Sequence, residues 1–163
     1  MAELTNLESK VAEVLGLAQA AQGATDKVAG LTMDEDLKHQ LRQMKQEAVE
    51  TEERTTELVS ALEGKKTAIL DKARETKQEA TEMMRTYLGS DADELDGFEF
   101  LTMAEAAEIG HWGIVAKMNE RANVPGLQEL VDWVTPIQQR HFSQTLESSF
   151  KLASEEDPNE AES

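Results

Sequence analysis

The chain has 163 residues, 33 of them acidic and 16 basic, which gives a formal net charge of -17 at pH 7. Such an excess of negative charge argues against nucleic-acid phosphates and anionic membranes as partners. The chain has no cysteine and no apolar run approaching roughly 18 residues, which excludes disulfides, cysteine-rich zinc sites and a transmembrane helix of ordinary length.

Two long helices are predicted in the first part of the chain. The first begins near Thr5, because the Thr5 hydroxyl and Glu8 three residues later form a capping-box pattern, and it ends near Gly30. A second capping box, Thr32 with Glu35, predicts the start of the next helix. The apolar residues of both helices recur at alternating spacings of three and four, which is typical of helices packed in a bundle.

The second helix carries two candidate site residues. Its inward side becomes small and polar around Thr51, and Glu47 and Glu50 flank this stretch. Gly64 predicts its end, since glycine suits the left-handed position after a helix. Residues 66–88 then form a separate amphipathic helix that crosses back along the bundle, with an apolar side made of Ile69, Ala73, Ala80, Met83, Met84 and Tyr87.

The second half of the chain predicts two more long helices. A loop at residues 89–93 precedes the first of them, with Ser90 or Asp91 as its cap, and this helix runs to about Asn123. The last helix begins near Leu127 after a short turn. Short turns join antiparallel neighbours, so we expect these two helices to pack side by side.

The inward stripe of the third long helix combines aliphatic residues with an acid and a histidine: Leu101, Ala104, Glu108, His111, Val115, Met118 and Ala122. Burying a carboxylate is costly unless it is neutralised, hydrogen-bonded or bound to a metal. Glu108 and His111 are therefore candidate functional residues. Gly110 and Gly113, on either side of His111 and Trp112, predict that a neighbouring backbone approaches closely there.

The last helix carries Gln138 and His141 on its inward side. Pro136 lies inside this helix and predicts a kink one turn before these two residues. The segment 154–163 is acidic, and we expect it to be a disordered tail behind a single domain at 1–153.

Two long helices, a crossover helix and two more long helices describe an all-α, ferritin-like antiparallel four-helix bundle, whose metal site lies midway along the four facing helices. Three of the helices offer a pair of candidate ligands each: Glu47, Glu50, Glu108, His111, Gln138 and His141. The first helix offers only Ala18 at that depth. At a rise of about 1.5 Å per residue, His111 and His141 each lie about 21 Å along their helices from the turn that joins them. We therefore expect the two rings to meet.

Residues 5–153 resemble the YciE/YciF-type ferritin-like proteins of bacteria and archaea. The resemblance rests on the order of elements, on DLKHQLRQMKQEAVETEERTTEL and GKKTAILDKARETKQEATEMM, and on AAEIGHWGIVAKMNERA with the short turn and helix after it. It implies a ferritin-like fold, a homodimer, a di-metal site and a link to stress. The chain departs from the family where Gly110-His111-Trp112-Gly113 replaces Glu-His-Tyr-Glu and where Gln138 replaces a glutamate.

Two functions follow from this comparison of residues. In the favoured one, the chain keeps the bundle and has a degenerate metal site, and it serves as a structural or interaction protein without enzymatic activity. In the alternative, Glu108, His111 and His141 bind iron, manganese or zinc with help from Glu47 or Glu50, and the protein has an oxidative or metal-handling activity. Since the N-terminal segment has neither the basic nor the apolar region of a signal peptide, we expect a cytoplasmic protein in both cases.

Overall fold

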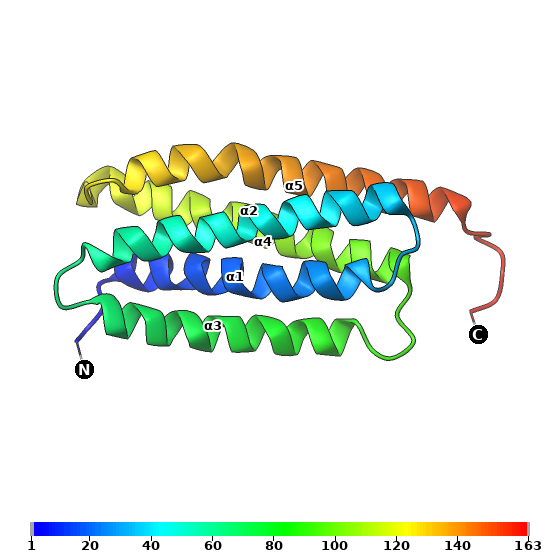
Figure 1. The fold of residues 1–163 in the computed structure, drawn as a ribbon, viewed down its shortest axis with the longest axis horizontal. Helices are drawn as coiled ribbons and strands as arrows, with labels where there is room; N and C mark the ends of the chain where they lie inside the picture. Colours follow the sequence, from blue (N-terminus) through cyan, green and yellow to red (C-terminus); the bar gives the residue numbers. More distant parts are fainter. Residues whose placement is uncertain (1, 163) are drawn as a thin grey trace.

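The computed structural model describes residues 2–162, and over that range the chain is helical without any strand. Figure 1 shows the helices side by side along the long axis of the molecule. Their bounds are α1 Asn6–Ala29, α2 Glu35–Ser60, α3 Lys66–Tyr87, α4 Glu94–Ala122 and α5 Leu127–Glu155. Within the described part of the chain, no helix combines the length and apolarity needed to cross a membrane.

The start of α1 is confirmed, whereas the predicted start of α2 is wrong. Thr5 and Glu8 form the capping box at the beginning of α1. The cap of α2 is Asp34 in place of Thr32, because the Asp34 carboxylate accepts bonds from the first free N–H groups of the helix, 2.8 Å from the nitrogen of Asp36. The Thr32 hydroxyl instead accepts a bond from the Asp34 N–H at 3.1 Å.

Other helix ends lie within a few residues of their predicted places. α2 ends at Ser60, before Gly64, which lies in the connecting turn with a positive φ of 74°. The cap of α4 is Asp93, which forms a capping box with Asp96, so the predicted caps at 90 and 91 are wrong. α5 runs as one helix through Pro136 and continues to Glu155, two residues into the predicted tail.

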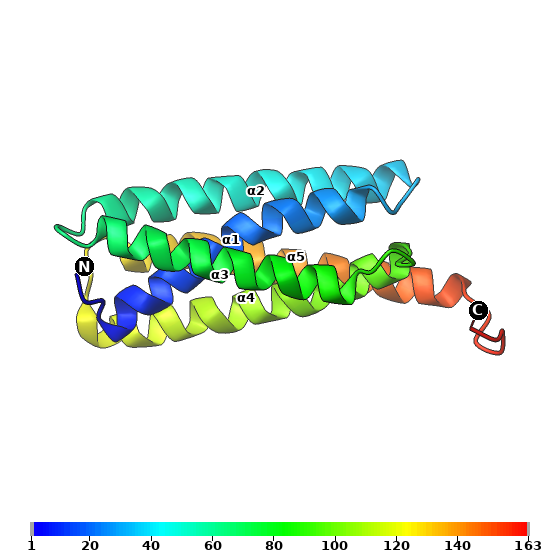
Figure 2. The same ribbon diagram turned by 90° about the horizontal axis from the view of Figure 1, so that it is seen from below.

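The helices α1, α2, α4 and α5 form an antiparallel bundle, and α3 lies outside it against α1. The colours in Figure 1 show that α1, α3 and α5 run in one direction and α2 and α4 in the other. Figure 2 shows the same bundle from below, with α3 crossing in front of α1. The chain therefore crosses back along the bundle through α3, as the sequence predicts.

Glycine allows the close approach of α1 and α3, although at a different place from the one expected. A Cβ on Gly16 would lie 2.7 Å from the Cβ of Thr76 and would also overlap the carbonyl oxygen of Ala73. A Cβ on Gly110 or Gly113 would meet no atom within 4 Å. The prediction of a close backbone approach beside His111 is therefore wrong, because these glycines face outward.

The core has two apolar clusters with a polar layer between them. One cluster includes Leu7, Val14, Trp112, Val115 and Leu127, and the other includes Val28, Leu41, Met44, Phe98 and Leu101. Between them, along the middle of the helices, are the buried polar residues Thr51, Thr55, Glu105, Glu108, Gln138, His141 and Thr145. This polar layer is where a functional site is expected in a bundle of this kind.

Candidate functional site

The inward side of α4 differs from its predicted stripe. Its buried residues are Gly97, Phe98, Leu101, Glu105, Glu108, Trp112, Val115 and Asn119. Leu101, Glu108 and Val115 are confirmed as inward residues. Glu105, Trp112 and Asn119 replace Ala104, His111 and Met118, and Ala122 is exposed. The inward pair on α4 is consequently two glutamates rather than a glutamate and a histidine.

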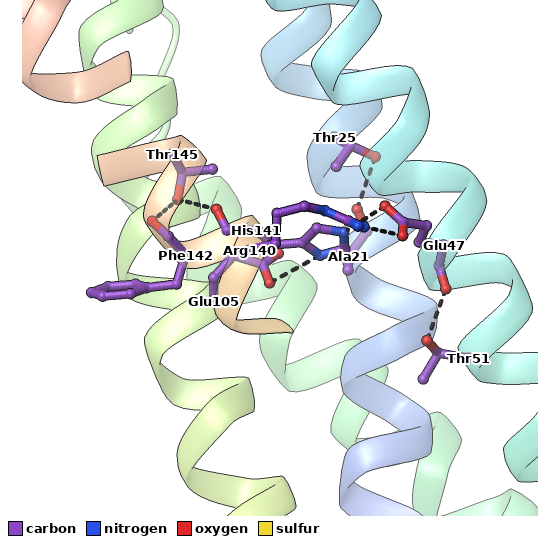
Figure 3. Close-up of polar contacts among 9 residues, drawn as sticks. All are labelled: Ala21, Thr25, Glu47, Thr51, Glu105, Arg140, His141, Phe142 and Thr145. Carbon is purple, nitrogen blue, oxygen red and sulfur yellow. Dashed lines mark hydrogen bonds and ion pairs between the residues drawn. The ribbon is translucent and has the colours of Figure 1, made fainter. Parts of the chain in front are cut away.

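His141 is at the centre of the polar layer, between two carboxylates from two other helices (Figure 3). Its Nε2 lies 3.1 Å from Oε1 of Glu47 on α2, and its Nδ1 lies 3.5 Å from Oε2 of Glu105 on α4. Both ring nitrogens can donate only when the imidazole is protonated. The arrangement therefore favours an imidazolium that connects α2, α4 and α5.

Arg140 adds a second positive charge to this cluster. Its guanidinium donates to Oε2 of Glu47, the carboxylate that His141 also contacts. Glu47 and Glu105 carry two negative charges, and His141 and Arg140 supply two positive charges that balance them. We call these four residues the histidine-carboxylate network.

The acid-base properties of His141 follow from this environment. Burial by itself would lower the pKa of His141, but Glu105 and Glu47 outweigh it through hydrogen bonding and charge, and the pKa lies above its ordinary value. A raised pKa keeps the ring protonated further into the neutral range. This direction agrees with a ring placed between two acceptors.

Glu108 lies beside the network in a different state. Burial and the nearby charge of Glu105 raise the pKa of Glu108 well above its ordinary value, and the Gln138 amide opposes this rise. The protonated form of Glu108 is therefore favoured relative to that of an exposed glutamate. Oε2 of Glu108 and Oε1 of Gln138 are buried, and in the described structure no hydrogen-bond partner meets them. The buried Oε2 of Glu105 has only Nδ1 of His141 near it, at 3.5 Å.

Two of the six predicted site residues lie away from this cluster. The side chain of His111 is 36% exposed, its Nδ1 lies 2.8 Å from the carbonyl oxygen of Ala107, and its Nε2 lies 3.7 Å from Glu13 of α1. The prediction that His111 faces inward and meets His141 is wrong. Glu50 forms an exposed ion pair with Arg54 on its own helix at 3.0 Å. The structure thus brings together only Glu47, Glu108, Gln138 and His141 of the predicted set.

The donor set does not fit a di-metal centre. Among residues 2–162, no group of three or more histidine, aspartate or glutamate side chains is arranged to hold a metal ion. The two nitrogens of His141 face carboxylates, and Arg140 places a positive charge on Glu47, where a cation would have to bind. Gln138 is a weaker ligand than a glutamate for a hard cation, and α1 supplies Ala18 at this level.

Sequence reasoning missed Glu105 and Arg140. Glu105 could have been found, because Phe98, Leu101, Glu105, Glu108 and Trp112 also alternate at spacings of three and four and include the larger aromatic residues. Arg140 gives no comparable signal, since it lies at the edge of the inward side of α5 and reaches Glu47 through its long side chain.

Comparison of the chain with models of known families, with curated proteins and with solved structures gave no match.

Proposed function

We propose that this chain is a ferritin-like bundle protein in which the histidine-carboxylate network occupies the place of a metal centre, and that it serves as a structural or interaction protein in the cytoplasm. One observation carries the proposal: both ring nitrogens of His141 face carboxylates from neighbouring helices. In a metal site, at least one imidazole nitrogen must be free to bind the metal as a neutral ligand. The link to stress and the absence of enzymatic activity belong to the same proposal.

The antiparallel order of the helices supports the ferritin-like part of this proposal. Four of the helices face one another, the fifth lies outside them, and the buried polar residues gather midway along the bundle. The network itself supports a structural role. Opposite charges on α2, α4 and α5 compensate one another there, which fixes how these helices are aligned.

Metal titration of the purified protein tests this function. We expect calorimetry with iron(II), manganese(II) and zinc to show no saturable binding at micromolar concentration, and metal analysis of the protein to find well under one equivalent. Binding of one or more equivalents would contradict the proposal if Glu108→Gln and His141→Ala abolish it. His111→Ala is the matched control, because this histidine lies outside the network. Such a result would favour the alternative, a metal-handling protein.

A further inference from the structure

An apolar groove opens between α1, α3 and α4 beside the polar layer. It has a volume of about 160 Å³, and small residues such as Ala20, Ala24 and Ala107 leave room between the helices. Met83 of α3 and Met103 of α4 border it and are 68% and 50% exposed. The second half of α3 was predicted to bury its apolar side, but only Ala68, Ile69 and Ala73 of this helix are buried. In the second half of α3, Ala80, Met83 and Met84 line the groove.

Two buried glutamates contribute to the wall of the same groove. Glu105 and Glu108 line it, and they are only 2% and 5% exposed. Oε2 of Glu108 has no hydrogen-bond partner in the described structure, whereas Oε2 of Glu105 lies 3.5 Å from Nδ1 of His141. An unpartnered buried acceptor costs about 1–3 kcal/mol, so a ligand that donates to Oε2 of Glu108 would gain that interaction. This oxygen is an observation independent of the apolar walls, and it indicates the polar end of a ligand.

We propose that this groove binds a small amphipathic amine, whose apolar part lies between α1, α3 and α4 and whose ammonium group donates to Glu108.

The size and polarity of the groove select the apolar part of the ligand. Apolar protein cavities of about 150 Å³ accept a molecule the size of benzene. The groove in this bundle has a similar volume and a wall that includes Leu17, Phe100 and Leu101. It suits one aromatic ring or a short alkyl chain.

Charge selects the head group. An ammonium supplies three donors and a positive charge, whereas a carboxylate would supply only acceptors and would face an acidic side chain. Burial and Glu105 disfavour the ionised form of Glu108, and a cation bound beside them would offset both effects. The chain carries a net charge of -17, which also raises the local concentration of cations. Because Oε2 of Glu108 is buried, binding requires a rotation of this side chain toward the ligand.

This site goes beyond the proposed function. The site needs only the groove and the carboxyl group of Glu108, and the metal titration described above does not test it.

Methyl NMR of the full chain with labelled methionine tests the site directly. Met83, Met84 and Met103 border the groove, while Met33 lies between α1 and α2 and does not line it. The probes are hexylammonium, hexanol and hexanoate, which share an alkyl chain and differ in the head group. We expect saturable shifts of the groove methyls only, with affinity falling from hexylammonium to hexanol by at least about tenfold and hexanoate weakest. Equal affinity for the three compounds, or no saturable shift, would overturn the proposal.

Two variants separate the head-group contact from the apolar contact. Glu108→Gln should remove most of the preference for hexylammonium over hexanol and leave hexanol binding unchanged. Ala80→Leu fills the groove and should weaken both compounds by at least about tenfold. Ala153→Leu is the matched control, because Ala153 is exposed on α5 and should leave both affinities unchanged. Hexylammonium binding that neither Glu108→Gln nor Ala80→Leu alters would mean attraction to the acidic surface only, and the proposal would be wrong.

Discussion

His141 connects three helices through a single ring, so its removal should destabilise the protein. His141→Ala leaves Glu47 and Glu105 without their shared donor, and Glu105 is almost fully buried. We expect the free energy of unfolding to fall by about 2–4 kcal/mol, because unpaired buried charges are costly and a cavity remains. Urea denaturation followed by circular dichroism measures this change.

His111→Ala is the control for that experiment. The ring of His111 is partly exposed and lies only 3.7 Å from Glu13 at the surface of the bundle. We expect a change of at most about 0.5 kcal/mol. If the two variants lose the same stability, the assignment of His141 to the centre and His111 to the periphery is wrong.

The network and Glu108 also determine how stability depends on pH. The pKa of His141 is raised in the folded protein, so its contribution is complete below about pH 6.5 and is lost as the pH rises through the folded pKa. The pKa of Glu108 is also raised, so the folded state keeps a proton that the unfolded chain releases above about pH 4.3. Both groups make the folded state less stable as the pH increases. Glu47, Glu105 and Arg140 are the charged groups that face His141.

We therefore expect the urea midpoint to fall steadily between about pH 5 and pH 9. Glu108→Gln should reduce the slope, since glutamine has no proton to release, while Glu50→Gln at the surface should leave the slope unchanged. A midpoint that rises with pH, or equal slopes in the protein and Glu108→Gln, would contradict the raised pKa of Glu108.

At the scale of the helices, a pair of glycines on α1 tests how α3 packs. Gly16→Ala places a methyl group 2.7 Å from the Cβ of Thr76 and against the backbone of Ala73, so we expect a loss of about 1–3 kcal/mol. A Cβ on Gly23 would meet no atom within 4 Å, and Gly23→Ala should stabilise the helix by about 0.5–1 kcal/mol. Thermal unfolding of both variants measures the difference. Equal effects would show that α3 does not approach α1 at Gly16.

The helices themselves could be predicted from the sequence because capping residues and apolar spacing are local signals. The capping box at Thr5 and the start of α3 at Lys66 illustrate this. The rotation of α4 about its axis could not be predicted in the same way. Three of its inward positions, Glu105, Glu108 and Asn119, are polar, while the apolar Ile114 is exposed, so hydropathy favours a neighbouring set of residues. Contacts with α1 and α5 decide which residues of α4 are buried. The spacing of apolar residues along α4 alone does not reveal these contacts.

The candidate site was only partly predictable for the same reason. Gln138 and His141 could be found from the spacing on α5, where the inward side is apolar from Leu127 to Val134. The pairing of His141 with Glu105 depends on the rotation of α4 about its axis. The contact of Arg140 with Glu47, which are 93 residues apart in the sequence, depends on the distance between α5 and α2. Neither is a property of a single helix.

At the scale of the whole molecule, self-association stays a prediction, and the exposed apolar residues are the candidates for a contact between copies. Trp112 is buried in the core, and Arg54 stacks on Trp133 at 4.2 Å, so the protein's own chain accounts for both tryptophans. Phe150 on α5 is 65% exposed and is a better candidate for a contact between copies. We expect sedimentation equilibrium at micromolar concentration to give a homodimer and Phe150→Ser to weaken it. A monomer for the unaltered protein would remove this prediction.

The central claim is that a protonated His141 takes the place of a metal centre. It can be tested by measuring the protonation state of the imidazole itself. Long-range ¹H–¹⁵N spectra at neutral pH distinguish an imidazolium, in which both nitrogens are protonated, from a neutral or metal-bound ring. Our account predicts an imidazolium at His141, whose Nε2 lies 3.1 Å from Glu47 and whose Nδ1 lies 3.5 Å from Glu105, and no change when one equivalent of zinc is added. A neutral His141 ring, or nitrogen shifts that move to the metal-bound range with zinc, would contradict it.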